Sequence, residues 1–177
     1  MKGQYKMSEL RLEVMQGDIS PSLSCGEKSI DALMGLAYSK TVSKQALAYN
    51  ILVDEHLVGN CMLKLVRLCD EIADYYISDN EFIALELSYL AIDRRLQGQG
   101  IGTLVLKKLI QWARMKSEEL PIRFFVLDAF EARKGWYRGV GFGEYPKKMD
   151  PRCPGTVAMR MDFINLELAS KDIDLPV

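Results

Sequence analysis

A glycine-rich turn between an apolar strand and a helix could bind a pyrophosphate group without a metal ion. Residues 87–92 are typical of a strand, and Gly98, Gly100 and Gly102 follow before the amphipathic segment 103–115. Glycines let the backbone approach an anion closely, and the N–H groups that begin a helix point at it with the positive end of the helix dipole behind them. The spacing therefore predicts an anion-binding loop at the start of this helix.

Two common phosphate-binding loops do not fit this spacing. A P-loop ends in Gly-Lys-Ser/Thr, whereas Gly102 is followed by Thr103 and Leu104. A dinucleotide fingerprint needs Gly-x-Gly-x-x-Gly and an acidic residue that closes the next strand about 20 residues later. Here the glycines recur at every second position, and residues 117–119 are typical of a helix end.

A carboxylate lies in the middle of the predicted strand 82–92. Alternation places Glu86, Ser88 and Leu90 on one face and the odd-numbered residues 85–91 on the other. A glutamate inside such a strand is costly to bury without a partner, and desolvation would make it a better proton acceptor. Glu86 is therefore a candidate general base, and the alternative is a structural carboxylate that is solvated or paired with an arginine.

The loop and a second segment resemble the GCN5-related N-acetyltransferases. Arg95-x-x-Gly98-x-Gly100 is similar to the coenzyme A signature of that family, Arg/Gln-x-x-Gly-x-Gly/Ala, and it follows a Leu-Ala-Ile strand end. Residues 128–142 contain Trp-Tyr-x-x-x-Gly-Phe, which is similar to another family segment. The resemblance implies a single mixed α/β domain over residues 1–169. Its mostly antiparallel central sheet would be splayed at its centre and flanked by helices. Residues 170–177, at the end of the chain, are expected to form a flexible tail.

The resemblance also assigns roles to residues. A tyrosine at the position of Tyr137 often protonates the departing thiolate, since a phenol with a pKa of about 10 can supply a thiol with one of about 8.5. The alternative is that Trp136 and Tyr137 are an aromatic pair that packs a short helix. Glu86 lies where histone-type members carry their catalytic glutamate, and the backbone N–H of Leu90 would stabilise the oxyanion formed when an amine attacks acetyl-coenzyme A directly. The residues expected to bind the coenzyme are Leu90, Ala91, Ile92, Arg95, Gln97, Gly98, Gln99, Gly100, Ile101, Gly102, Thr103 and Lys134.

The acetyl acceptor is open to several interpretations. Glu86 favours a strongly basic primary amine on a small molecule, a polyamine or a protein, because such an amine is protonated at pH 7 and needs a base. Residues 23–33, however, are similar to the opening of acetyltransferase toxins that modify aminoacyl-tRNA. A basic cluster within residues 133–152 could bind tRNA, but a pI of about 5.9 lacks the basic excess usual in nucleic-acid binders, so tRNA is less favoured. A non-catalytic module that binds coenzyme A is a further alternative.

The composition is that of an ordinary single-core domain. The chain has 177 residues, of which 49% are hydrophobic, and a formal net charge of −1. It has neither the apolar run of a signal peptide nor the roughly 18 consecutive apolar residues of a membrane span, which predicts a cytoplasmic protein with no membrane partner. Four cysteines without Cys-x-x-Cys spacing and one histidine predict reduced thiols and no metal site. The family resemblance is compatible with a homodimer.

Hydrophobic periodicity predicts the elements that position these residues. We expect His56 to occupy the turn of a hairpin, Ser29 to cap the first helix, and Leu104 to lie on the buried face of the helix after the glycines. The expected strands cover residues 10–15, 48–53, 57–66, 82–92, 122–127 and 156–163, and the expected helices cover 29–37, 103–115 and 131–138.

Overall fold

The chain divides into two compact units, which are described one at a time. The structure is a computed structural model that describes residues 9–69, 81–145 and 155–164. The first unit comprises the described parts of residues 1–66 and 85–112, and the second comprises those of 67–84 and 113–177.

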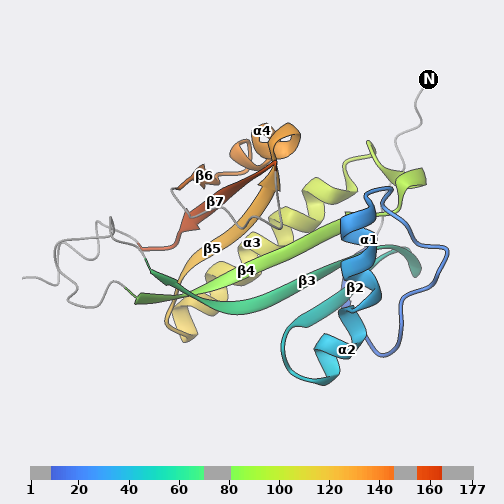
Figure 1. Ribbon diagram of the computed structural model, residues 1–177, viewed down its shortest axis with the longest axis horizontal. Coiled ribbons are helices and arrows are strands. Elements are labelled where there is room, and N and C mark those ends of the chain that lie inside the picture. The colour runs from blue at the N-terminus through green and yellow to red at the C-terminus, as the bar shows by residue number, and fades with distance from the viewer. Residues whose placement is uncertain (1–8, 70–80, 146–154, 165–177) are drawn as a thin grey trace, which may run out of the picture. The chain divides into compact units, whose positions relative to one another are not determined.

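The first unit contains four neighbouring strands in the order β1, β2, β3, β4 (Figure 1). β1 (Leu10–Val14) pairs antiparallel with β2 (Leu47–Val53), which pairs antiparallel with β3 (His56–Cys69) around a bulge between Ile51 and Leu52. The hairpin turn consists of Asp54 and Glu55, both with positive φ. A two-residue turn with both φ positive matches the twist of the two strands. Since Asp54 and Glu55 complete this turn, His56 is the first residue of β3, and the expectation that it occupies the turn is wrong.

β3 and β4 (Glu81–Ile92) approach each other closely at one glycine. The Asp93 N–H donates to the Val58 carbonyl, while Lys64 meets Glu86, so the two strands run in opposite directions. A Cβ added to Gly59 would lie 2.3 Å from the carbonyl oxygen of Ala91. Only glycine permits this approach.

Two short helices pack on one face of these strands, as Figure 1 shows. α1 (Lys28–Gly35) and α2 (Ala37–Val42) replace the one helix expected over 29–37. The α1 N-cap is Glu27, whose carboxylate accepts from the Ser29 N–H, so the expected Ser29 cap is wrong. The buried cluster under the helices contains Met15, Leu23, Met34, Ala37, Ala48, Met62, Tyr89 and Ala91.

The helix after the glycines, α3 (Ile101–Glu119), begins two residues earlier than expected. Its buried residues are Ile101, Val105, Leu106, Leu109 and Ala113. Leu104 is 43% exposed, which contradicts its predicted burial. At about 100° per residue, Leu104 lies roughly 130° from the centre of the arc that the buried residues define.

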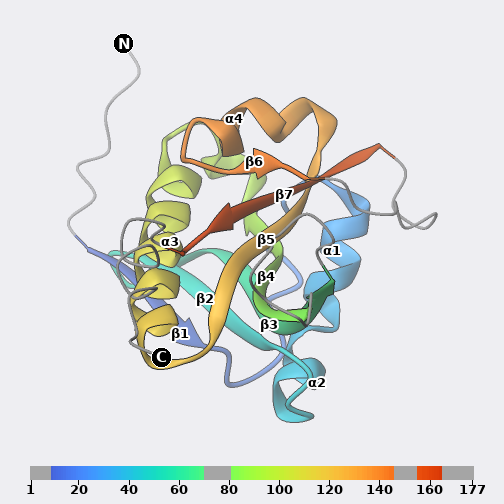
Figure 2. The ribbon, with the colours of Figure 1, turned by 90° about the vertical axis from the view of Figure 1, so that its left-hand side faces the viewer.

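The second unit contains strands in the order β5, β7, β6, which Figure 2 shows. β5 (Ile122–Phe130) pairs antiparallel with β7 (Thr156–Asp162), and β7 with the short β6 (Gly143–Glu144). The helix expected over 131–138 is a 3₁₀ turn, η2 (Glu131–Arg133), followed by α4 (Lys134–Arg138). Phe124 and Phe125 are fully buried, and the Phe125 and Phe142 rings lie 5.5 Å apart.

The mixed α/β class expected from the sequence is confirmed. Seven strands and their flanking helices are described, and every strand pair with a described register is antiparallel. The splay of the sheet and the domain bounds stay predictions. The expected tail 170–177 lies outside the described residues.

Candidate functional site

The glycine loop has the backbone that its sequence predicts. Gly98 and Gly100 have φ values of +78° and +85°, and a Cβ at either position would meet nothing within 4 Å. The Leu104 N–H donates to the Gly100 carbonyl as α3 begins, and the N–H groups of a first turn have no partner inside their own helix. Gln99 is exposed, Gly102 and Thr103 are half-buried, and Ile101 is buried. The loop therefore combines left-handed glycines, open space and a helix start, which suits a pyrophosphate.

A buried aspartate anchors the chain just before the loop. Asp93 is 3% exposed and caps the 3₁₀ turn η1 (Arg94–Leu96). Its Oδ1 accepts from the backbone N and Nε of Arg95 at 2.9 and 3.0 Å, and its Oδ2 accepts from Nη2 at 2.6 Å. The hydrogen bonds from Arg95 lower the pKa of the Asp93 carboxyl despite its burial. Two of the five guanidinium N–H groups are used, so the exposed Arg95 side chain keeps donors for a phosphate.

Gln97, another predicted coenzyme ligand, uses its side chain within the protein. Its Nε2 donates to the carbonyls of Cys25 and Ile92 at 2.9 and 3.0 Å. The two side-chain N–H donors of Gln97 therefore hold the loop in place. A role for Gln97 in coenzyme binding stays a prediction.

Glu86 forms an ion pair that the sequence analysis did not identify. Its Oε1 lies 2.9 Å from Lys64 Nζ and accepts from the Ser88 hydroxyl at 3.2 Å. Oε2 has no partner within the part of the chain that the structure describes. Glu86 and Ser88 share a side of β4, while Tyr89 and Ala91 pack in the cluster under α1 and α2, as alternation predicts. Leu90, whose backbone N–H is the predicted oxyanion donor, is half-buried, and Ile92, a predicted coenzyme contact, is buried.

Tyr137, in the second unit, has the aromatic packing that the sequence offered as one alternative, and its catalytic role stays a prediction. Its ring packs 4.6 Å from that of Trp136 and 6.0 Å from that of Phe142. Burial raises the pKa of Tyr137 to about 12, with the charge of Arg133 opposing the shift. Its hydroxyl makes no hydrogen bond within the described residues. The phenol is therefore protonated at neutral pH and able to donate a proton.

Two of the three described cations of the basic cluster, Lys134 and Arg138, form ion pairs with acids, and the third is Arg133. Lys134 pairs with Glu131 and lies 3.9 Å from Glu144, which also pairs with Arg138. Lys147, Lys148, Asp150 and Arg152 lie outside the described residues. The expected contact between Lys134 and the coenzyme stays a prediction.

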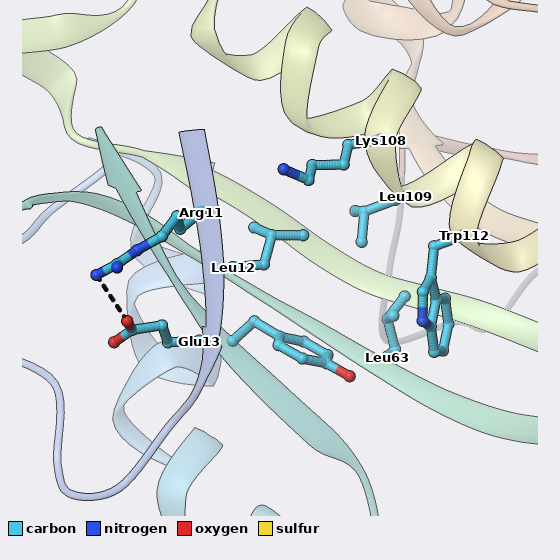
Figure 3. A pocket seen from close by; sticks show the side chains of 8 residues that line it. Arg11, Leu12, Glu13, Leu63, Lys108, Leu109 and Trp112 are labelled. Carbon is cyan, nitrogen blue, oxygen red and sulfur yellow. Dashed lines mark ion pairs between the residues drawn. The ribbon is translucent and has the colours of Figure 1, made fainter. Parts of the chain in front are cut away.

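A pocket of about 370 Å³ lies in the first unit, and Figure 3 shows side chains that line it. Its apolar walls come from Leu12, Tyr49, Leu63, Leu109 and Trp112, and its polar lining comes from Arg11, Glu13 and Lys108. Arg11 pairs with Glu13 at 2.9 Å, and Lys108 donates to the Leu10 carbonyl at 2.7 Å. No residue predicted to act in catalysis or coenzyme binding lines this pocket.

Among residues 9–69, 81–145 and 155–164, no group of three or more His, Cys, Asp or Glu side chains could hold a metal ion. In the same ranges, no helix has the length and apolarity needed to cross a membrane.

Comparisons with known proteins identify the family. The model of the Acetyltransferase (GNAT) domain matches residues 47–144, more than half of the chain. A search of curated protein sequences gave no match. Similar solved structures include a bacterial toxin, with 20% identity and a TM-score of 0.72 over 96% of this chain and 98% of that one. They also include AtaT complexed with acetyl-methionyl-tRNAfMet, with 20% identity and a TM-score of 0.72 over 92% and 99% of the chains. AtaTR bound with AcCoA is similar at 20% identity, with a TM-score of 0.71 over 93% and 99% of the chains.

The matched residues include the glycine loop, Glu86 and Tyr137. An acetyltransferase fold was the expectation from the sequence, and the solved structures agree with it. The chain belongs to the GNAT acetyltransferase family.

Proposed function

We propose that this protein transfers the acetyl group of acetyl-coenzyme A to the α-amine of aminoacyl-tRNA. Membership of the acetyltransferase family supports the reaction class. The solved structures of AtaT with acetyl-methionyl-tRNAfMet and of AtaTR with AcCoA support the acceptor and the donor. The single observation in this chain that carries the choice of acceptor is the ion pair between Lys64 and Glu86.

The glycine loop would hold the donor. The open space at Gly98 and Gly100 would accept a pyrophosphate, and the Arg95 guanidinium, held by Asp93, would donate to a phosphate oxygen. When bound, acetyl-coenzyme A supplies an activated thioester. The backbone N–H of Leu90 would stabilise negative charge on the carbonyl oxygen during attack, and Tyr137 would give its proton to the departing sulfur.

The ion pair favours an acceptor that arrives uncharged. A lysine or polyamine amine, with a reference pKa of about 10.4, is cationic at pH 7, whereas an α-amine near 7.7 is partly neutral. An uncompensated Glu86 would attract a cationic amine. With Lys64 Nζ 2.9 Å away, the pair is electrically neutral and offers such an amine no net attraction. The α-amine of an aminoacyl ester therefore suits this site better than a polyamine.

Acetylation of a strongly basic small amine is the second candidate. Its support is Glu86 Oε2, which has no partner within the described residues and could accept a proton from the acceptor. Glu86 taken without Lys64 favours this acceptor, as expected from the sequence alone.

Selectivity of the Lys64→Gln variant tests the proposal. We expect the wild-type protein to acetylate charged tRNA faster than spermidine. In the variant, the ratio of the rate with charged tRNA to the rate with spermidine should fall about tenfold, because the negative charge of Glu86 is no longer neutralised by Lys64. Lys107→Gln removes an equal charge from an exposed position of α3 and serves as the control. Wild-type protein that prefers spermidine would contradict the proposal and favour the second candidate.

A further inference from the structure

The segment before α1 is fastened to the glycine loop, although the two are far apart in the sequence. The Ser24 carbonyl accepts from the Arg94 N–H at 2.8 Å, and the Cys25 carbonyl accepts from Gln97 Nε2 at 2.9 Å. Gln97 also donates to Ile92 at the end of β4 and directly precedes Gly98. All of these residues belong to the first unit.

Asp31 fixes the conformation of that segment. Its Oδ2 accepts from the Ser24 hydroxyl at 2.6 Å, and its Oδ1 accepts from the N–H and Sγ of Cys25 at 2.9 and 3.2 Å. The Gly26 N–H donates to the Ser24 hydroxyl at 3.1 Å. Burial raises the pKa of the Asp31 carboxyl, but the hydrogen bonds from Ser24 and Cys25 outweigh burial and lower it.

Gly26 permits the close contact between the two segments. Its φ is +82°, and an added Cβ would lie 3.1 Å from Cδ of Arg94. A side chain at this position would therefore be strained by the backbone and would displace the exposed Arg94 side chain by a few tenths of an ångström.

We propose that Asp31 and Gln97 are positioning residues that hold the glycine loop in the conformation that binds coenzyme. Together with residues 24–26 they form a brace, in which Asp31 orders the Ser24 and Cys25 carbonyls and Gln97 binds one of them next to Gly98. Neither side chain needs to touch the coenzyme. The brace lowers the entropy that the loop loses on binding, so it acts on affinity rather than on the chemical step.

The inference rests on the proposed coenzyme site, and it is tested by two disrupting variants, Gln97→Met and Asp31→Ala, and one partial-rescue variant, Asp31→Asn. Gln97→Met keeps the length of an exposed side chain but removes both donors. Asp31→Ala removes the acceptor, and Asp31→Asn keeps one oxygen and should recover part of the loss. Ser22→Ala is the control, because within the described residues its exposed hydroxyl bonds only to the Ser20 hydroxyl, and the Ser22 backbone N–H that also donates to Ser20 is kept.

We expect Gln97→Met to weaken binding of coenzyme A about tenfold, with kcat at saturating donor within twofold of wild type. Without coenzyme, the amides of residues 98–102 should exchange their hydrogens faster in both variants. The double variant should lose less affinity than the sum of the single losses, because both act through one brace. Ser22→Ala should change none of these quantities.

Coenzyme binding by the wild-type protein distinguishes failure of the proposed site from failure of the brace. Wild-type protein that binds no coenzyme A would refute the proposed site and this inference with it. If the wild type binds coenzyme A, and Gln97→Met and Asp31→Ala keep its affinity and its amide exchange at residues 98–102, the inference alone is overturned. A fall in kcat at unchanged affinity would overturn it as well. Thermal melts identify any variant that fails to fold, and Gln97→Met is then decisive because its side chain is exposed.

Discussion

Substitution of Gly100 by alanine should separate the cost of backbone strain from the loss of coenzyme binding. An added Cβ meets no atom within 4 Å, so the variant creates no steric clash in the protein alone. Its φ of +85° lies in the left-handed region, where a residue with a side chain costs about 1–2 kcal/mol. For a protein of this length that cost lowers the melting temperature by about 2–8 °C.

The effect on coenzyme binding should be larger than the effect on stability. The methyl group would enter the space where the pyrophosphate approaches the backbone, and the loop would no longer present its N–H groups correctly. Loss of one hydrogen bond to a charged group is worth about 1.5–3 kcal/mol, which corresponds to a roughly 10- to 150-fold rise in Kd.

Calorimetric titration with coenzyme A and thermal melts measure the two effects side by side. Gly17→Ala is the matched control, since a Cβ there meets nothing within 4 Å and its φ is outside the left-handed region. It should bind coenzyme A like the wild type. A Gly100→Ala protein that melts a few degrees lower but keeps wild-type affinity would refute the assignment of this loop to the pyrophosphate.

Four further changes test other parts of the structure. Gly59→Ala should lower the free energy of unfolding by about 1–3 kcal/mol or more, measured by urea denaturation, because its Cβ would lie 2.3 Å from the Ala91 carbonyl; an unchanged midpoint would contradict the described strand contact. Tyr137→Phe should lower kcat by about 10²–10⁴-fold and leave the Kd for coenzyme A unchanged, whereas equal activity would leave the ring a packing role only. Asp93 has a lowered pKa, so its stabilising effect is complete above about pH 4 and is lost as the pH falls through its folded-state pKa. Asp93→Asn should therefore make the free energy of unfolding depend less on pH on the acid side, and an unaltered pH dependence would count against the role of Asp93. Burial raises the pKa of Cys25 to about 11, so iodoacetamide at pH 8 should alkylate it roughly a hundredfold more slowly than in unfolded protein, as peptide mass spectrometry can measure.

Local chemistry made the glycine loop predictable from the sequence. Gly98 and Gly100 have the backbone that their spacing indicates, and the strand and helix on either side were predicted in the correct order. Alternation along β4 correctly separated Glu86 from Tyr89. These features depend on residues that are close together in the chain.

Features set by long-range pairing could not be predicted in the same way. Lys64 meets Glu86 only through the register of two strands, and Gln97 meets Cys25 across 72 positions. Competition between similar groups explains a smaller error, because Glu27 and Ser29 can both cap a helix and the carboxylate of Glu27 is the acceptor observed. The buried Asp93 lies between the end of β4 and the 3₁₀ turn η1. Its position directly before Arg94 and Arg95 was the signal in the sequence that could have indicated its pairing with an arginine.

The most direct test of the central claim is transfer of labelled acetyl to methionyl-tRNA by the wild-type protein. The products are hydrolysed in mild alkali, which releases the amino acid from the tRNA, and the label is then located by chromatography. Uncharged tRNA and spermidine serve as competing acceptors in parallel reactions. We expect the label on N-acetylmethionine, with none on uncharged tRNA. Label on spermidine and none on the released amino acid would contradict the proposal.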